Sequence, residues 1–167
     1  MKAKQITSIA ILTTIALIIF MVEVQIPVLL PIPGVKLGLA NIVTIYAMFM
    51  LTPKDTFYIL ILRVFLGSVF SGRIMTFLYS LTGGLLCYGM LLIMRKFVSD
   101  KYIWVCGVFG GVVHNLGQIL VAIIILQTPM LFYYFPILMV TGIITGIFTG
   151  ICSQMLIKAM GITSKKL

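Results

Sequence analysis

Long runs of apolar residues are the feature that most constrains this chain. Hydrophobic residues make up 62% of the sequence and charged residues only 9%, whereas a soluble domain carries about 25% charged residues. A helix that crosses a bilayer needs about 20 mostly apolar residues. The sequence therefore predicts an all-α membrane protein in which residues 1–167 form a single integral membrane domain. The apolar runs cover roughly residues 6–22, 37–52, 56–70, 74–94, 102–126 and 130–157.

The basic residues predict how these runs are oriented. The chain has 12 Lys and Arg residues against 3 Asp and Glu residues, and membrane proteins concentrate Lys and Arg in their cytoplasmic loops. Six transmembrane helices with both termini in the cytoplasm leave only Lys36 and Arg73 in outer loops and Arg63 within a span. The basic residues do not cluster on a polar element, so we expect no nucleic-acid partner. The inner set is Lys2, Lys4, Lys54, Arg95, Lys96, Lys101, Lys158, Lys165 and Lys166.

A stretch rich in proline and glycine separates the first two apolar runs. Residues 31–41 read PIPGVKLGLAN, and this number of prolines and glycines interrupts a helix. In the predicted orientation Lys36 lies here on the outer side, and Arg73 lies in a second outer turn. Glu23 is the only acid of this half, so its potential is positive. The sequence therefore predicts an anionic or aromatic small-molecule ligand near the outer face.

Polar side chains inside the apolar runs are the remaining candidates for binding, because ionisable groups are costly in lipid. Arg63 stays charged and needs a partner. A pair with Glu23, ligation by carbonyl groups and a contact with an anionic ligand are all open. His114, Asn115 and Gln118 are three and four residues apart, so they lie close together on one helix. A single histidine does not supply the three or four ligands of a zinc site, so we expect no metal.

Small residues recur every four positions in three of the apolar runs. Such stripes let two helices approach closely, and neighbouring threonines can form hydrogen bonds across the contact. Packing within one bundle and docking on another membrane subunit are both open, and the first helix is the better docking candidate because it lies at the chain end. The stripes are Gly142, Gly146 and Gly150; Gly107 and Gly111; and Ala10 and Thr14.

The sequence does not have the features of an enzyme. There is no Walker A sequence, so the chain does not bind and hydrolyse a nucleotide through a P-loop. Asp55 and Asp100 are separate in the sequence and do not form the acidic clusters that hold magnesium on a diphosphate. We therefore expect a protein without catalytic activity or cofactor, whose transport function would need energy from partner subunits.

Three stretches, PGVKLGLAN at 33–41, FSG at 70–72 and HNLGQ at 114–118, resemble the bacterial Gx transporter family. This family is also labelled heptaprenyl diphosphate synthase component I, and the resemblance covers nearly the whole chain. The family is in turn similar to the S components of energy-coupling factor (ECF) vitamin transporters, which bind substrate. The resemblance implies an S-component-like bundle of six helices in the bacterial plasma membrane.

The same resemblance implies roles for particular residues. Lys36 and Asn41 would belong to the binding loop and the start of the second helix, over a vitamin, a flavin or an isoprenoid-related molecule. Ala10 and Thr14 would dock on a transmembrane coupling subunit, and two ATPase subunits would drive the cycle. With the polar residues described above, the expected substrate-binding set is Lys36, Asn41, Arg63, Arg73, His114, Asn115 and Gln118.

Two other functions stay open at the level of sequence. The synthase label suggests a non-catalytic membrane accessory subunit of prenyl diphosphate or quinone biosynthesis, which would hold a lipid product or recruit a soluble synthase. The second open function is that of a purely structural subunit in a larger membrane complex. Loss of Arg63 and His114 would impair folding or assembly in a structural subunit, and ligand binding in a receptor.

Overall fold

The computed structural model describes residues 3–26, 37–72 and 74–160, and within these ranges the chain is helical and has no β-strand. Each of the six apolar runs contains one α-helix, so the predicted all-α class is confirmed. Two short 3₁₀ helices, η1 (Asp100–Tyr102) and η2 (Pro129–Tyr134), precede the last two α-helices. The α-helices are α1 (Ala3–Gln25), α2 (Asn41–Met50), α3 (Pro53–Ser71), α4 (Ile74–Phe97), α5 (Ile103–Leu126) and α6 (Phe135–Ala159).

Four helical segments of the described residues are long and apolar enough to cross a membrane. They contain α1, α4, α5 and α6. The helix α2 has 10 residues and a length of only about 15 Å, half of the hydrocarbon thickness of about 30 Å. The helix α3 has 19 residues, but it contains Lys54, Asp55 and Arg63. A multi-pass membrane protein is thus supported, and the count of six spans stays a prediction.

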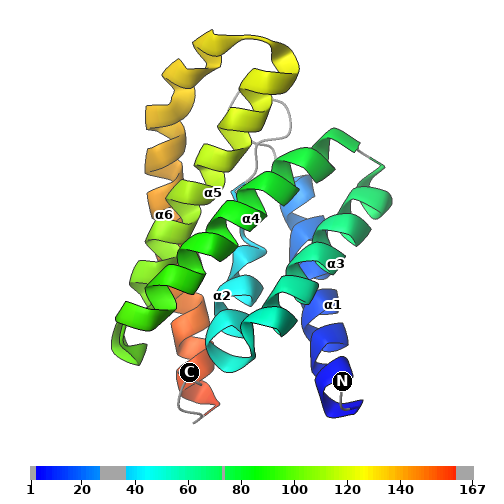
Figure 1. The fold of residues 1–167 in the computed structure, drawn as a ribbon, viewed down its shortest axis with the longest axis vertical. Coiled ribbons are helices and arrows are strands. Elements are labelled where there is room, and N and C mark those ends of the chain that lie inside the picture. Colours follow the sequence, from blue (N-terminus) through cyan, green and yellow to red (C-terminus); the bar gives the residue numbers. More distant parts are fainter. Residues whose placement is uncertain (1–2, 27–36, 73, 161–167) are drawn as a thin grey trace.

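The short helix α2 lies at the centre of the bundle (Figure 1). It contacts all five other α-helices, while α5 packs mainly on α6 and α4, and α1 packs mainly on α3. Eight of its ten residues are buried. The predicted run 37–52 is longer than this helix because Gly38 has a φ of +78°, a left-handed conformation that favours glycine and that precedes the first helical turn.

Local sequence signals fix the ends of α3. The hydroxyl of Thr52 caps the helix by accepting the backbone N–H of Asp55 at 3.3 Å, Pro53 takes the first helical position, and Gly72 ends the helix with a φ of +64°. These are favoured residues at such positions. Asp55 also accepts a hydrogen bond of 2.6 Å from the side chain of Gln5, which joins the start of α3 to the start of α1.

The glycine stripes of α5 and α6 face each other. A Cβ atom added to Gly146 would lie 2.5 Å from the carbonyl oxygen of Gly107, and one added to Gly150 would lie 2.5 Å from that of Trp104. Only glycine permits this close approach of two backbones. Of the two alternatives that the sequence leaves open, packing within the bundle is therefore the one observed for these stripes, including Gly111 and Gly142.

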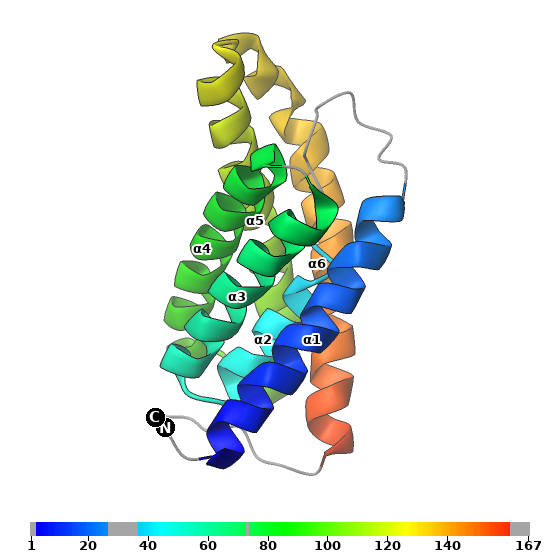
Figure 2. The same cartoon turned by 90° about the vertical axis from the view of Figure 1, so that its right-hand side faces the viewer.

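Basic residues gather at one end of the bundle. The described ranges contain seven of the twelve Lys and Arg residues, and six of these lie at the end where α1 begins and α6 ends (Figure 2). Arg63, in the middle of α3, is the exception. This asymmetry is the one that the positive-inside rule describes. The six residues are Lys4, Lys54, Arg95, Lys96, Lys101 and Lys158.

Candidate functional site

Buried polar side chains from five helices meet inside the apolar bundle, in the half away from the basic end. We call this group the polar cluster. Each member is at most 9% exposed, although polar groups are costly to bury unless they are hydrogen-bonded. Its members are Glu23 of α1, Asn41 of α2, Arg63 of α3, Ser80 of α4, and His114 and Gln118 of α5.

Arg63 lies at the centre of the polar cluster. Its Nη2 donates a hydrogen bond of 2.9 Å to Oδ1 of Asn41, the first residue of α2. It also interacts electrostatically with the carboxylate of Glu23. Its Nε has no hydrogen-bond partner among the described residues. Arg63 therefore has a hydrogen bond to α2 and a longer-range electrostatic interaction with α1, while a direct pair with Glu23 and a contact with an anionic ligand both stay predictions.

Glu23 fixes the start of α2 to the end of α1. Its Oε1 accepts the backbone N–H of Gly38 at 2.5 Å, and hydrogen bonds to a charged acceptor are short and strong. The carbonyl oxygen of Gly38 then accepts the N–H of Asn41 at 2.9 Å. A buried carboxylate therefore stabilises the left-handed turn at Gly38 through a direct hydrogen bond.

His114 lies between two glycines. A Cβ atom added to Gly38 would lie 3.3 Å from Cδ2 of the imidazole, and one added to Gly83 of α4 would lie 2.9 Å from Nδ1. The Nε2 atoms of His114 and Gln118 are 3.1 Å apart, and the amide nitrogen donates to Nε2 when the neutral ring carries its proton on Nδ1. Gly83 of α4 and Gly38 in the turn before α2 thus make room for the ring, and Gln118, one helical turn away, orients it.

Asn115 points to a different neighbour. Its amide nitrogen donates to the carbonyl oxygen of Leu138 at 2.7 Å and lies 3.5 Å from the hydroxyl of Thr141. Both partners belong to α6. The structure therefore does not bring Asn115 together with His114 and Gln118 at one cavity, because adjacent residues on a helix face different directions.

The expected docking residues Ala10 and Thr14 lie on an exposed side of α1. The hydroxyl of Thr14 donates to the carbonyl oxygen of Ala10 within the same helix, at 3.0 Å, so it is satisfied without a partner. Lys36 and Arg73, the two other expected binding residues, lie outside the residues that the structure describes.

The polar cluster borders a cavity of about 10 Å³, which is roughly the space that one water molecule needs. Donors and acceptors from α1, α3, α4 and α5 converge on it. A larger molecule would bind only if the surrounding side chains moved apart. The lining residues are Phe20, Glu23, Gly38, Arg63, Ser80, His114 and Gln118.

Four of these lining residues were not in the set expected from the sequence. Glu23 carried a usable signal, because it is an acid that directly follows the first apolar run and a pair with Arg63 was one expectation from the sequence. Gly38 lies in the proline- and glycine-rich stretch. Phe20 and Ser80 carried none, since both residue types are common in apolar helices. Among the described residues, no three His, Cys, Asp or Glu side chains come together as a metal site would require.

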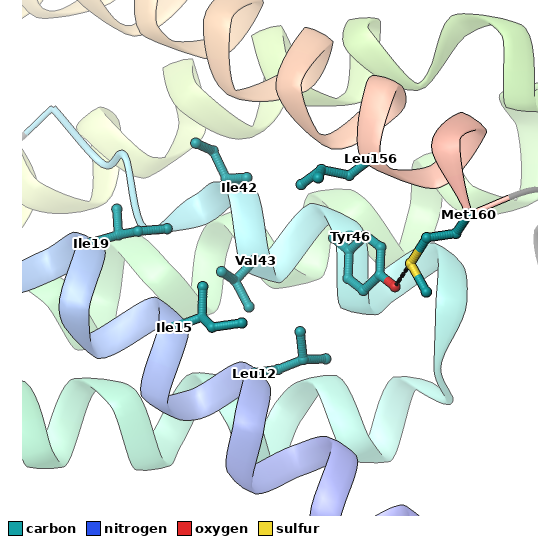
Figure 3. A pocket seen from close by; sticks show the side chains of 8 residues that line it. All are labelled: Leu12, Ile15, Ile19, Ile42, Val43, Tyr46, Leu156 and Met160. Carbon is teal, nitrogen blue, oxygen red and sulfur yellow. Dashed lines mark hydrogen bonds between the residues drawn. The ribbon is translucent and has the colours of Figure 1, made fainter.

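A larger and almost entirely apolar groove lies between α1 and α6, with α2 as its floor (Figure 3). Its volume is about 240 Å³. In the described part of the chain α1 and α6 do not contact each other, and this separation leaves the groove. The hydroxyl of Tyr46 donates to Sδ of Met160 at 2.8 Å. The lining residues are Leu12, Ile15, Ile19, Ile42, Val43, Tyr46, Leu156 and Met160.

Comparison with known proteins gives one family. The model of the family described as heptaprenyl diphosphate synthase component I matches residues 12–156. No curated protein and no solved structure matches the chain. The matched range includes the whole polar cluster and, apart from Met160, all residues of the apolar groove.

Proposed function

The chain belongs to the heptaprenyl diphosphate synthase component I family, and on this basis we propose that it is the substrate-binding membrane subunit of a small-molecule transporter. Its role would be that of an ECF S component. The observation that carries the proposal is the polar cluster around Arg63, which is buried in an apolar bundle. Ionisable residues inside a membrane are costly and mark binding sites or transport pathways.

In this proposal all six α-helices lie in the bacterial plasma membrane, with both termini in the cytoplasm. The concentration of basic residues at the end where α1 begins supports that orientation. The polar cluster then lies toward the outer face. A vitamin, a flavin or an isoprenoid-related molecule would bind there, next to the ring of Phe20.

Partner subunits would supply the energy for transport. We propose that α1 docks on a transmembrane coupling subunit through the side that carries Ala10 and Thr14, which are exposed, and that two ATPase subunits complete the transporter. Small exposed residues on a membrane helix permit close approach of another helix.

Mass spectrometry of the purified protein tests the binding role. We expect a small molecule to be released from the native protein and to be missing from the Glu23→Gln, Arg63→Gln double variant, which keeps the balance of charge. Thr13→Val is the control, because Thr13 is a buried residue of α1 that does not line the cavity. The proposal fails if nothing co-purifies and no vitamin, flavin or prenyl diphosphate raises the melting temperature.

The apolar groove favours a second candidate, a non-catalytic accessory subunit of prenyl diphosphate or quinone biosynthesis. Its aliphatic lining suits an isoprenoid chain, which would gain stability from burial of apolar surface. The groove residue Ile15 and the exposed residue Ile18, which is outside the groove, allow a matched test. We expect Ile15→Trp, but not Ile18→Trp, to abolish retention of a C35 prenyl diphosphate in native mass spectra. Equal retention in both variants would exclude this use of the groove.

A further inference from the structure

We propose that the apolar groove between α1 and α6 binds one acyl chain of an anionic phospholipid, and that the headgroup of this lipid lies at the basic end. The chain would fill the space that separates the two helices. This inference goes beyond both proposed functions, because it concerns a lipid that the protein retains and neither transports nor passes to a synthase. It commits to a phospholipid rather than to a prenyl diphosphate.

The first argument is the chemistry of the groove. Its volume is about 240 Å³, and among its lining residues only Tyr46 has a side-chain oxygen or nitrogen atom. In the described part of the chain α1 contacts α2 and α3 but not α6, so none of these helices fills the groove. A void leaves the side chains that line it without contacts on one side. An acyl chain supplies such contacts and needs no hydrogen bond.

The second argument is the position of the groove along α1. Helical spacing places Lys4 on the same side of α1 as the groove residues Leu12, Ile15 and Ile19. Ile19 follows Lys4 by 15 positions, a distance of about 22 Å along the helix. Half of a bilayer with its headgroups measures about 20–22 Å. A lipid whose headgroup lies beside Lys4 therefore places the end of its chain beside Ile19.

The third argument is the polar atom at one end of the groove. Figure 3 shows Ile19 and Ile42 at one end and Tyr46 with Met160 at the other, and Met160 directly follows α6 at the basic end. The hydroxyl of Tyr46 donates to Sδ of Met160, which is a weak acceptor. A phosphate or ester oxygen of a lipid would accept a stronger hydrogen bond from this hydroxyl.

The fourth argument is the charge around this end of the groove. The described residues of the basic end carry six positive formal charges and, on Asp55 and Asp100, two negative ones. Asp55 is buried and accepts a hydrogen bond from Gln5, whereas Lys4 of α1 and Lys158 of α6 are exposed. Basic residues beside a membrane attract anionic headgroups. A zwitterionic headgroup has no net charge and gains less from them.

Two phospholipids with identical chains, dioleoyl phosphatidylglycerol and dioleoyl phosphatidylcholine, test the role of the headgroup. The native protein is placed in nanodiscs that contain equal amounts of both, and native mass spectrometry identifies the lipid that it retains. We expect at least about a fivefold preference for phosphatidylglycerol. Lys4→Gln should remove most of this preference. Lys54→Gln should keep it, because Lys54 lies at the same end on α3, which does not line the groove.

A tryptophan in the groove tests the role of the chain. We expect Ile15→Trp to abolish lipid retention because its ring fills the groove, and Ile18→Trp to leave retention unchanged because Ile18 lies outside it. Equal retention of both phospholipids by the native protein would overturn the inference. Equal effects of the two tryptophans, or of the two lysine substitutions, would overturn it as well. If Ile15→Trp does not fold, the comparison of Lys4→Gln with Lys54→Gln decides.

The same spectra distinguish this inference from the proposed functions. Retention of a prenyl diphosphate without any phospholipid would overturn the inference and support the accessory function. A native protein that releases no small molecule but retains phosphatidylglycerol in the pattern above would support the inference, although the transporter proposal would lack its ligand.

Discussion

At the scale of single residues, the pair Glu23 and Arg63 has the largest electrostatic consequence. Each is almost completely buried, and the two opposite charges interact electrostatically. Removal of one partner of a buried ion pair leaves an uncompensated charge and typically costs about 3–5 kcal/mol. We therefore expect the two side chains to be coupled in the stability of the fold.

We predict that Arg63→Met lowers the free energy of unfolding by about 3–5 kcal/mol, because it removes a buried cation that interacts electrostatically with the buried Glu23 carboxylate. The double variant Glu23→Gln, Arg63→Met should recover most of that loss. Denaturant titration of the four proteins of this double-mutant cycle, in the same detergent, measures the difference. A double variant whose loss equals the sum of the two single losses would show that the pair is not coupled.

Two glycines of α4 give a second prediction at this scale. A Cβ on Gly83 would lie 2.8 Å from the carbonyl oxygen of His114 and 2.9 Å from its Nδ1, whereas a Cβ on Gly89 meets nothing within 4 Å. We expect Gly83→Ala to destabilise the protein by about 1–3 kcal/mol. Gly89→Ala should be neutral or stabilising by up to about 1 kcal/mol, since alanine is the better helix former. Thermal unfolding compares the pair, and equal effects would contradict the position of His114.

At the scale of helices, the contact of α5 with α6 depends on glycines rather than on large side chains. Their backbones approach so closely at Gly107 and Gly146 that neither position has room for a Cβ atom. Asn115 adds a hydrogen bond from α5 to the backbone of α6. Packing of small residues and interhelical hydrogen bonds are what hold membrane helices together, because burial from lipid gives little hydrophobic gain.

We predict that Gly146→Ala separates α5 from α6 and lowers stability by about 1–3 kcal/mol, because its Cβ would lie 2.8 Å from Cα of Val108. Ile144→Ala is the control on the same helix, since Ile144 is 62% exposed and faces away from α5. Melting temperatures in nanodiscs give the comparison. A larger effect at Ile144 would mean that the face of α6 has been assigned incorrectly.

At the scale of the whole molecule, the distribution of charge and the position of the polar cluster define two different ends. The basic end holds the start of α1 and the end of α6, and η2 lies at the opposite end (Figure 1). Phe97 and Tyr133 are each 82% exposed and lie at the basic end and in η2, respectively. The two positions are therefore suitable reporters of membrane orientation.

We predict that a membrane-impermeant maleimide added to intact cells labels a Tyr133→Cys variant and not a Phe97→Cys variant. The three native cysteines are replaced by alanine in both, and the Phe97→Cys variant should be labelled only after the cells are permeabilised. This result follows if the basic end faces the cytoplasm. The reverse pattern of labelling would invert the proposed orientation and place the polar cluster toward the cytoplasm.

The sequence alone determined the helical class, the approximate helix positions and the concentration of basic residues at one end. Apolar runs and charge are local properties of the sequence. In lipid, a single apolar run can form all its backbone hydrogen bonds internally only as a helix. The sequence also identified Arg63, His114 and Gln118 as residues of interest. It overextended the second run at Gly38, because it does not reveal the left-handed turn.

Only the tertiary structure decided which polar residues share a cavity. The bonds from Arg63 to Asn41 and from Glu23 to Gly38 join residues 22 and 15 positions apart, and Asn115 reaches α6 rather than the cavity. Helical spacing shows which residues share a side of one helix, but not which neighbour that side meets. That choice depends on how all helices pack at once, and here it brought Glu23 of α1 and Arg63 of α3 to one cavity.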